Sequence, residues 1–517
     1  MPNRTGGMPM NRPSQTTDPR QPPSRQAEAP RAWTKAALEK QFNGSEDVMV
    51  RSAYFGEYSE KEVVLLYNTG LCDTISINKF VLPELGACYR KLGSFSRPLL
   101  QLSEALTLQG FDRNPGPQEV EDIVYDGMLL LLFVQEGSLA YMDLSDKPNR
   151  TPYESSTEIS IKGPKDCFIE DIDVNVALIR KRVRSSSLVT ERYTIGRRTR
   201  TKVVLMYFRD ILKPKTLEVV RSRLGNIDID GLYSINQLED LLTQNRLKIL
   251  PLMDFTGRPD YVVSCLLAGR FIIFVDGNPM VLIAPSGISL IMKSPEDVHF
   301  NYSYVSFARL VRLLSLFISI FLPGIWVALM AFHQDQIPFR LMATISVSRL
   351  GLPLSSQMEM FLLLMLLEIF KEAGVRLPNP IGQTLTSIGG LIIGDAAIRA
   401  GLVSPSVVVI GAITAVSGVT LVNQSLSTVI SIIRLFFFLL ASVFGLYGLI
   451  LGIVLFVAYM SKLQSFGANY LAPLSPLIPR DVLNSFLRAP WYFIRRRPAS
   501  MSEKGMDGDH QKEEEQS

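Results

Sequence analysis

Charged side chains inside a long apolar stretch are the residues of this sequence best suited to chemistry. Asp395 and Arg399 stand four residues apart in the small-residue segment 381–400, so on a helix they share a face and can pair. A charge at membrane depth costs about 2.5–3.5 kcal/mol even on a lenient insertion scale, so it should face protein or water. Two interpretations stay open: a structural ion pair near a membrane surface, and part of a pore lining or its mouth.

Residues near this pair fit the same two interpretations. Glu368 and Glu372 precede it and are candidates for further charged rings, although Glu372 and Arg376 also stand four apart and can form a structural pair instead. Small residues in this segment allow close helix contacts and leave room for water. The candidate pore or intramembrane residues are Glu368, Glu372, Gly390, Gly394, Asp395 and Arg399.

The elements that must hold these charges are helices of a membrane domain. Segments 313–332 and 435–460 each carry about the 20 apolar residues that an α-helix needs to cross a bilayer, and neither contains a charge. Segments 381–400 and 402–422 add two crossings, and 358–370 predicts a short re-entrant or interfacial helix. Basic residues before the first crossing and after the last favour the cytosolic side, which predicts an even number of crossings, four. Glycines on neighbouring turns of the last crossing predict a helix-packing seam at Gly445, Gly448 and Gly452.

The chain before the membrane domain has the pattern of a soluble protein that is built twice. An apolar strand at 61–67 returns at 201–207, and a strand with an acidic-Gly turn at 127–137 returns at 269–277. The two offsets, 140 and 142 residues, are nearly the same for independent landmarks. We therefore expect two related α/β modules, each a mixed sheet with helices packed on it.

These patterns predict a fold class and five parts. The fold is an α/β cytosolic region of two related modules, followed by an α-helical transmembrane bundle of about four spans plus a short re-entrant or interfacial helix. The N-terminal segment is rich in Pro, Arg and Gln and lacks the apolar core of a signal peptide, so we expect the modules to stay in the cytosol. The parts are a disordered segment 1–46, a first module 47–150, a second module 151–300, a transmembrane domain 301–470 and a cytosolic tail 471–517.

Two basic clusters lie in the first part of the second module. Segment 171–184 has apolar residues at helical spacing and a basic last turn, and a second cluster precedes residue 203. No aromatic stacking platform or RNA-binding signature accompanies them, so a solvated face or a salt-bridged subunit contact is favoured over binding to nucleic acid or lipid headgroups. With two predicted turns, the candidate interface or hinge residues are Arg180, Arg182, Arg258, Pro259, Asp260, Asp276 and Gly277.

Composition and motifs speak against an enzyme. The net charge of +4 is small for 517 residues and does not favour nucleic acid as a partner. The four cysteines form no CxxC pair, and the three histidines are too dispersed to make a metal site with them. The sequence contains no Walker loop, GxSxG or HExxH motif. We therefore expect no catalytic residue, no cofactor and no metal.

Several phrases spread over the chain go beyond these patterns. They resemble, in the same order, phrases of the A subunits of GerA-type spore germinant receptors, and they lie at 161–165, 175–182, 256–260, 275–279, 332–338, 372–378 and 394–405. The resemblance implies a multi-pass protein of the spore inner membrane that works with a transporter-like B subunit and a lipoprotein C subunit. It also implies a homo-oligomeric ring, a pentamer, that opens to release ions when germinant binds.

The sequence departs from the family pattern at Ser155, Gly257 and Asp395. Gln is usual at the position of Asp395, and an acidic ring there would favour cations. The leading hypothesis is a germinant-gated ion channel lined by 381–400. The alternative is a non-conducting scaffold that couples the germinant-sensing subunit to downstream germination machinery. A secondary transporter is less favoured, because the membrane half has no inverted repeat.

Overall fold

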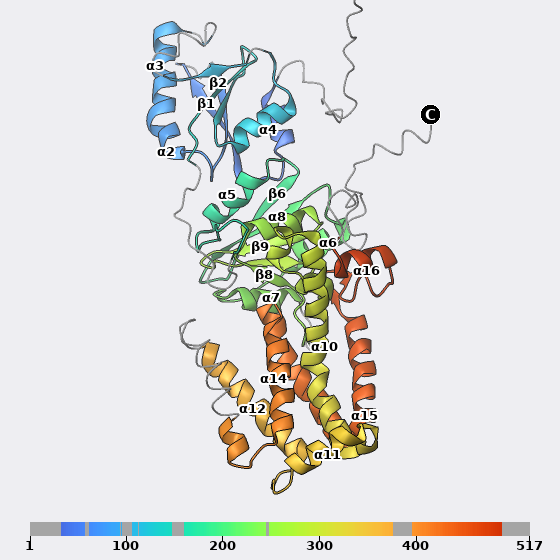
Figure 1. Cartoon of the computed structure of the whole chain (residues 1–517). Helices are drawn as coiled ribbons and strands as arrows, with labels where there is room; N and C mark the ends of the chain where they lie inside the picture. Colours follow the sequence, from blue (N-terminus) through green and yellow to red (C-terminus); the bar gives the residue numbers. More distant parts are fainter. Residues whose placement is uncertain are drawn as a thin grey trace, which may run out of the picture.

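The structure is a computed structural model with two sheet-containing units and a helical region. It describes residues 33–56, 61–93, 95, 106–111, 113–146, 160–243, 248–375 and 395–488. Figure 1 shows the two units stacked end to end, with long helices extending away from the second unit. We call these units module 1 (33–146) and module 2 (160–300), and the remainder the helical region.

Module 1 is a five-stranded sheet between two layers of helices. Its strand order is β1-β2-β4-β5-β3, with β1 (Val48–Phe55), β2 (Lys61–Asn68), β4 (Leu129–Phe133), β5 (Ser138–Met142) and β3 (Gln109–Gly110). One face is covered by α1 (Lys35–Gln41) and α4 (Pro117–Tyr125), and the other by α2 (Thr74–Ser76), a π-helical turn (Ile77–Val81) and α3 (Leu82–Leu92). Val64 and Leu66 pack towards α4, whereas Val63 and Leu65 pack towards α3, so β2 is buried on both faces.

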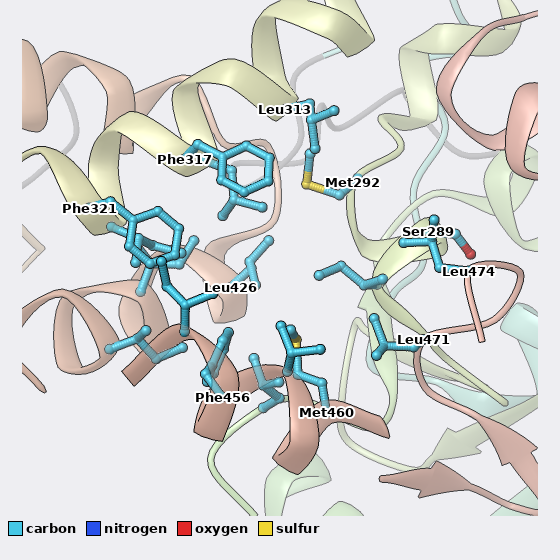
Figure 2. Close-up of a pocket in the computed structure, with 18 of the residues that line it drawn as sticks. Ser289, Met292, Leu313, Phe317, Phe321, Leu426, Phe456, Met460, Leu471 and Leu474 are labelled. Atoms are coloured by element: carbon cyan, nitrogen blue, oxygen red, sulfur yellow. The ribbon is translucent and has the colours of Figure 1, made fainter. Parts of the chain in front are cut away.

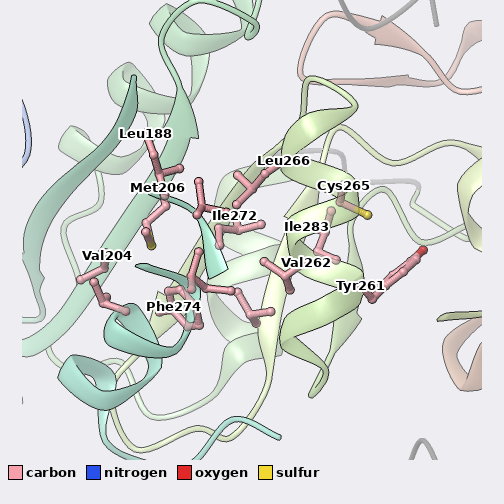
Figure 3. Packing of buried hydrophobic residues seen from close by; sticks show 14 of the residues in the cluster. Leu188, Val204, Met206, Tyr261, Val262, Cys265, Leu266, Ile272, Phe274 and Ile283 are labelled. Carbon is pink, nitrogen blue, oxygen red and sulfur yellow. The ribbon is translucent and has the colours of Figure 1, made fainter. Parts of the chain in front are cut away.

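Module 2 repeats this design. Its strand order is β6-β7-β9-β10-β8, with β6 (Leu188–Ile195), β7 (Thr201–Phe208), β9 (Phe271–Val275), β10 (Val281–Ala284) and β8 (Asp254–Thr256). The helices α5 (Ile172–Arg182) and α8 (Pro259–Leu267) cover one face, and α6 (Pro214–Gly225) and α7 (Ile235–Thr243) cover the other. Figure 3 shows Val262 and Leu266 of α8 packed against Ile272 and Phe274 of β9.

The shared strand order supports the expected pair of related modules. The starts of β1 and β6 are 140 residues apart, and those of α4 and α8 are 142 apart. The expectation of mixed sheets is wrong, because every strand pair described in the two sheets is antiparallel. Leu130 at the start of β4 pairs with Leu66 near the end of β2. The chain therefore enters β4 at the same end of the sheet at which it left β2, so β4 runs antiparallel to β2.

The structure also corrects the predicted N-terminal boundary. α1 lies inside the part predicted to be disordered, and the Thr34 hydroxyl accepts a hydrogen bond from the first turn of this helix (3.2 Å). Trp33 and Phe42 are buried in one core with α4, and Nε1 of Trp33 donates to the carbonyl of Pro115 (3.0 Å). Residues 33–46 therefore belong to module 1, because two aromatic side chains anchor them.

The helical region follows module 2 through two short elements, α9 (Ile288–Ile291) and the 3-10 turn η3 (Pro295–Val298). Its helices are α10 (Tyr302–Phe332), α11 (Phe339–Ser348), α12 (Ser356–Val375), α14 (Pro405–Val419) and α15 (Gln424–Lys462), with a turn η4 (Gln334–Gln336) before α11. A small hairpin, β11 (Gln464–Ser465) and β12 (Ala468–Asn469), and α16 (Pro479–Phe486) complete the described chain.

The long helix α15 consists of two antiparallel arms. Gly445 has φ 61° and ψ −143°, which other residues adopt only at a cost. On a straight helix Phe437 and Phe456 would lie about 28 Å apart, yet their ring centroids are 5.8 Å apart. The stretch predicted as one last crossing therefore folds back at Gly445. The predicted glycine seam lies between the arms, since a Cβ at Gly448 or Gly452 would collide with the first arm.

Both ends of α15 contact module 2. Asn423, the N-cap of the first arm, donates from Nδ2 to Oδ1 of Asp254 in β8 (2.6 Å). The hydroxyl of Tyr459, near the end of the second arm, accepts a hydrogen bond from the backbone N–H of Ile249 (3.0 Å). The apex at Gly445 contacts Phe332 at the far end of α10. The hairpin thus extends from module 2 to the distal end of the helical region.

By length and composition alone, two stretches of the described chain are long and apolar enough to cross a membrane, α10 and the part 426–462 of α15. The reversal at Gly445 divides the second stretch into two shorter arms. The predicted short helix 358–370 is longer than expected, because α12 has 20 residues. The predicted crossing 402–422 is shorter than expected, because its helix α14 has 15 residues. Most of the predicted crossing 381–400 lies outside the described residues. Four crossings therefore stay a prediction.

Candidate functional site

A buried arginine joins the two modules. Arg180, in the last turn of α5, binds the carboxylate of Asp47 in module 1 through Nε–Oδ2 (2.6 Å) and Nη2–Oδ1 (2.8 Å), and both side chains are buried. The guanidinium carbon lies 4.8 Å from the ring centroid of Tyr125 in α4. Burial would raise the pKa of Asp47, but the Arg180 guanidinium outweighs burial and lowers that pKa below its ordinary value. We call Arg180, Asp47 and Tyr125 the module joint.

Three other predicted interface residues serve module 2 itself. Arg182 pairs with Asp166 (2.5 Å) at a part-exposed site. Asp276 and Gly277 form the turn between β9 and β10, in which Gly277, with φ 79°, donates its N–H to the carbonyl of Glu170 (2.9 Å). These contacts are internal to module 2, so an interface role for these three residues stays a prediction.

A charged cluster lies between α8 and the start of α10. Arg258 is buried and precedes α8, which has Pro259 at its first position. Its guanidinium binds the carboxylates of Asp260 (2.8 Å) and Glu296, and Nε2 of His299 lies 2.9 Å from Oδ2 of Asp260. Burial would raise the pKa of both carboxyls, but Arg258 outweighs it and lowers both below their ordinary values. We call Arg258, Asp260, Glu296 and His299 the cap cluster.

The loop 161–165 packs on the cap cluster. Any side chain at Gly163 would collide with Arg258 and His299. The backbone N–H of Lys162 donates to the carboxylate of Glu296 (3.2 Å). The segment 161–165, which resembles a phrase of the GerA-type receptors, thus covers the cap cluster, and residue 163 is a glycine because a side chain has no space there.

A second charged cluster ties η3 to α10 and to the segment after α16. The carboxylate of Asp297 binds Arg309 (3.0 Å) and Arg312 (2.9 Å), both on α10. Arg488 donates to the backbone carbonyls of Asp297 and Phe300, the latter at 2.9 Å. We call Asp297, Arg309, Arg312 and Arg488 the membrane junction. The two α10 arginines are basic residues before the first predicted crossing, and from sequence they indicate only sidedness. Asp297 was missed because its arginine partners, 12 and 15 residues away, stand on another element and share no local pattern with it.

Charged residues also tie α12 to its neighbours. Glu359 is buried, binds Arg349 (3.1 Å) and accepts a hydrogen bond from the backbone N–H of Ser404 at the start of α14 (2.9 Å). Glu368, a predicted pore residue, pairs with Arg434 of the first α15 arm (3.1 Å). Charges inside a helical bundle are costly unless they are paired, so these contacts fix the position of α12.

The other predicted pore residues are placed only in part. Asp395 and Arg399 form the predicted pair (2.8 Å), and their side chains are 57% and 78% exposed. Glu372 lies in the last turn of α12. The Asp395–Arg399 pair and the Glu368–Arg434 pair share no residue, so they are two separate contacts. Outside the described residues lie Gly390, Gly394, Arg376 and Ser155.

The chemistry of these sites is charge pairing. Within the part of the chain that the structure describes, no group of three or more His, Cys, Asp or Glu side chains could hold a metal ion. Burial raises the pKa of the Cys72 thiol to about 12 and that of the Cys265 thiol to about 11, so both are poor nucleophiles. The arrangement is suited to holding modules and helices in register.

A family model described as Bacillus/Clostridium GerA spore germination protein matches residues 36–500. The chain belongs to the GerA family. The match includes both modules and the helical region, so the family resemblance inferred from the sequence phrases is confirmed.

Relatives of this GerA-family chain match most of its length. Spore germination protein XA of Bacillus anthracis is 39% identical over 464 residues, which are 89% of this chain and 94% of the relative. Spore germination protein KA of Bacillus subtilis (strain 168) is 32% identical and covers 91% and 86% of the two chains. Among solved structures, the N-terminal domain of the A subunit of the Bacillus megaterium spore germinant receptor GerK3 matches with 28% identity and a TM-score of 0.37, over 48% of this chain and 92% of that chain.

Proposed function

We propose that this GerA-family chain is the A-type membrane subunit of a nutrient germinant receptor in bacterial spore germination, and that its copies form a germinant-gated channel that releases ions. Its relatives carry the name spore germination protein, and the family match spans the modules and the helical region together. In this proposal the modules lie in the cytosol and the helical region lies in the spore inner membrane. The partners are further copies of the chain, forming a pentamer, a transporter-like B subunit, a lipoprotein C subunit and membrane lipid.

The exposure of Asp395 and Arg399 carries the channel proposal. Their side chains are 57% and 78% exposed in the single chain, although they belong to the helical region. A charge that faces lipid costs at least about 2.5 kcal/mol, so their exposed faces favour water or a neighbouring copy. A closed ring of copies around a water-filled axis provides both.

The directions of two helices support a further crossing between them. α12 starts at the Gly445 end of the bundle, where Gln357 donates to the carbonyl of Ser442 (3.4 Å). α14 starts at the same end, because Ser404 binds Glu359 in the first turn of α12 (2.9 Å). Two neighbouring helices that run in one direction need a return path, and the predicted pore segment provides one.

Ion flux from liposomes tests the channel. The full chain is reconstituted alone and with its B and C partners, and flux is recorded with and without germinant. We expect germinant-dependent flux, and we expect Asp395→Asn to lower the permeability of cations relative to anions, because an acidic ring favours cations. Arg197→Ala removes an exposed arginine of module 2 and serves as the control that should change neither quantity.

A non-conducting scaffold is the second candidate. It is favoured by the cap cluster, which ties α8 to η3, and by the membrane junction, whose Asp297 in η3 pairs with Arg309 and Arg312 of α10. In that role the chain would pass a conformational change from the sensing subunit to downstream machinery. A complex that responds to germinant but carries no flux would overturn the channel and leave the scaffold.

A further inference from the structure

A large apolar cavity lies between the helical region and module 2. Its volume is about 910 Å³, and it is bounded by α10, both arms of α15 and the segments around Met292 and Leu471. Figure 2 shows Phe317 and Phe321 of α10 and Phe456 of the second arm around one space, with nearly all drawn atoms being carbon. The polar residues of the lining are Ser289, Arg309, Ser461, Ser475 and Ser485.

This lining selects for an apolar occupant. The cavity is open on one side, since Phe317, Val457 and Leu474 of its lining are 52%, 46% and 41% exposed, and an apolar surface of this kind is unfavourable in contact with water. Apolar cavities take up apolar molecules in preference to water. Each CH₂ group that leaves water for such a site contributes about 0.8 kcal/mol. A hydrocarbon chain is therefore the chemistry that suits this site.

Positive charge gathers at one edge of the cavity. Arg309 lines the cavity, and Arg309 and Arg312 share one carboxylate, that of Asp297. Lys293 follows the lining residue Met292, and burial together with the neighbouring Arg309 lowers the pKa of its ammonium group to about 8. Arg309 also donates to the carbonyl of Ser485 (3.3 Å), and Arg312 donates to that of Met292 (3.5 Å). Basic side chains therefore gather at this edge, and an anionic group is the charge that suits them.

The charged edge lies at the level expected for lipid headgroups. Arg309 precedes the apolar run 313–332 by four residues, about 6 Å along a helix. The exposed aromatic residues Tyr302, Tyr304 and Phe307 stand just before it. Aromatic and basic residues at the cytosolic ends of membrane helices mark the membrane–water interface. The cavity therefore starts at the interface and extends along α10 towards the hydrocarbon level.

We propose that this cavity binds an anionic membrane phospholipid, with its phosphate beside Arg309 and an acyl chain between α10 and the two arms of α15. Basic pockets between membrane helices on the cytosolic side suit anionic headgroups. The planar guanidinium matches the oxygens of a phosphate. The bound lipid links α10 to both arms and so stabilises the contact between module 2 and the helical region. This holds whether the chain conducts ions or acts as a scaffold.

Thermal unfolding of the full chain in detergent tests the site. Phosphatidylglycerol and phosphatidylcholine with the same acyl chains are added at equal concentrations, and inorganic phosphate is added separately. We expect phosphatidylglycerol to raise Tm by at least about 2 °C more than phosphatidylcholine, and inorganic phosphate to have no effect. Equal shifts with the two lipids, or an equal shift with inorganic phosphate, would overturn the proposal.

Two pairs of variants locate the binding. Ile453→Trp fills the cavity from the second arm, whereas Val454→Trp adds the same bulk at a neighbouring position that is 59% exposed. We expect the first variant to lose the shift caused by phosphatidylglycerol and the second to keep it. Arg309→Gln should lose the preference for phosphatidylglycerol. Arg312→Gln removes the other α10 partner of the same carboxylate without lining the cavity, and it should keep that preference.

A photoactivatable phosphatidylglycerol analogue identifies the occupant directly, and it does so even if a variant is poorly folded. Crosslinks in the wild-type chain should map to the lining residues of α10 and α15. Crosslinks confined to outward residues such as Val454 would contradict the proposal. In a separate experiment, a photoactivatable residue at position 453 that crosslinks to a second copy of the chain would assign the cavity to a contact between copies. That result would also contradict the proposal.

Discussion

Module 1 and module 2 share one fold and differ in the side chains at equivalent positions. Both α4 and α8 have proline at the first position, but the preceding residue is Gly116 in module 1 and Arg258 in module 2. Gly116 has no side chain, whereas Arg258 binds Glu296 in η3, where the neighbouring Asp297 pairs with α10. The duplicated sheet is thus a common scaffold, and the link to the helical region depends on a few charged residues at its edge.

The largest expected effect comes from separating the two modules at their joint. Arg180→Met leaves the Asp47 carboxylate buried without a counter-charge, which should lower the free energy of unfolding by about 3–5 kcal/mol. Urea unfolding of the full chain in detergent measures this loss. Arg182→Met removes a neighbouring, part-exposed arginine and should cost less than about 1 kcal/mol. Equal losses in the two variants would show that Arg180 does not hold the modules together.

Replacing Arg258, the residue before α8, with the glycine that stands before α4 in module 1 should have the next largest effect. Arg258→Gly leaves Asp260 and Glu296 without their shared partner and should cost about 2–4 kcal/mol at neutral pH. The folded-state pKa values of both carboxyls lie below the ordinary values, so their stabilisation is present above the ordinary range and is lost as pH falls through the folded-state pKa. Unfolding curves of wild type and variant should therefore converge in acid. A constant gap at all pH values would contradict this account.

Asp254 of module 2 should respond to pH in the opposite sense. Burial raises its pKa from 3.8 to about 6, despite hydrogen bonds from Tyr261 and Asn423. Because the folded-state pKa is raised, the stabilisation by protonation is full below pH 3.8 and is lost as pH rises through about 6. Asp254→Asn keeps the size of the side chain and should raise the free energy of unfolding at pH 8 by on the order of 2 kcal/mol. The gain should vanish at pH 4, and Asp228→Asn, at an exposed pair, is the control.

The reciprocal exchange in module 1 should have the smallest effect. Gly116→Arg places the module 2 residue at an open position with φ −74°, where nothing lies within 4 Å of an added Cβ. We expect the free energy of unfolding to change by less than about 0.5 kcal/mol. The same urea unfolding measures it, and a loss above about 1 kcal/mol would mean that the two caps differ in more than this side chain.

The duplication was predictable from sequence, and the strand directions were not. Buried central strands such as β2 and β7 need continuous apolar runs, so their positions and spacing can be recognised directly. The direction of a strand depends on the end of the sheet at which the chain re-enters it. The composition of the connecting segment does not show which end that is. α1 was missed because the burial of Trp33 and Phe42 depends on α4, a distant element.

The charged sites follow the same division between local and distant information. The Asp395–Arg399 pair was predictable because spacing on one helix determines it. Arg488 and Asp297 are 191 residues apart in the sequence, and no local pattern predicts their contact. The reversal of α15 was also missed, because the glycine spacing predicts a packing seam without specifying whether the partner is another helix or the same one.

The hairpin form of α15 has a consequence for topology mapping. Its two ends contact Asp254 and Ile249, both in module 2. A hairpin returns the chain to the compartment that it left, whatever depth its apex reaches. A reporter fused after Lys462 should therefore share the compartment of a reporter in module 2, while an epitope inserted at Gly445 alone decides whether the apex emerges on the opposite surface.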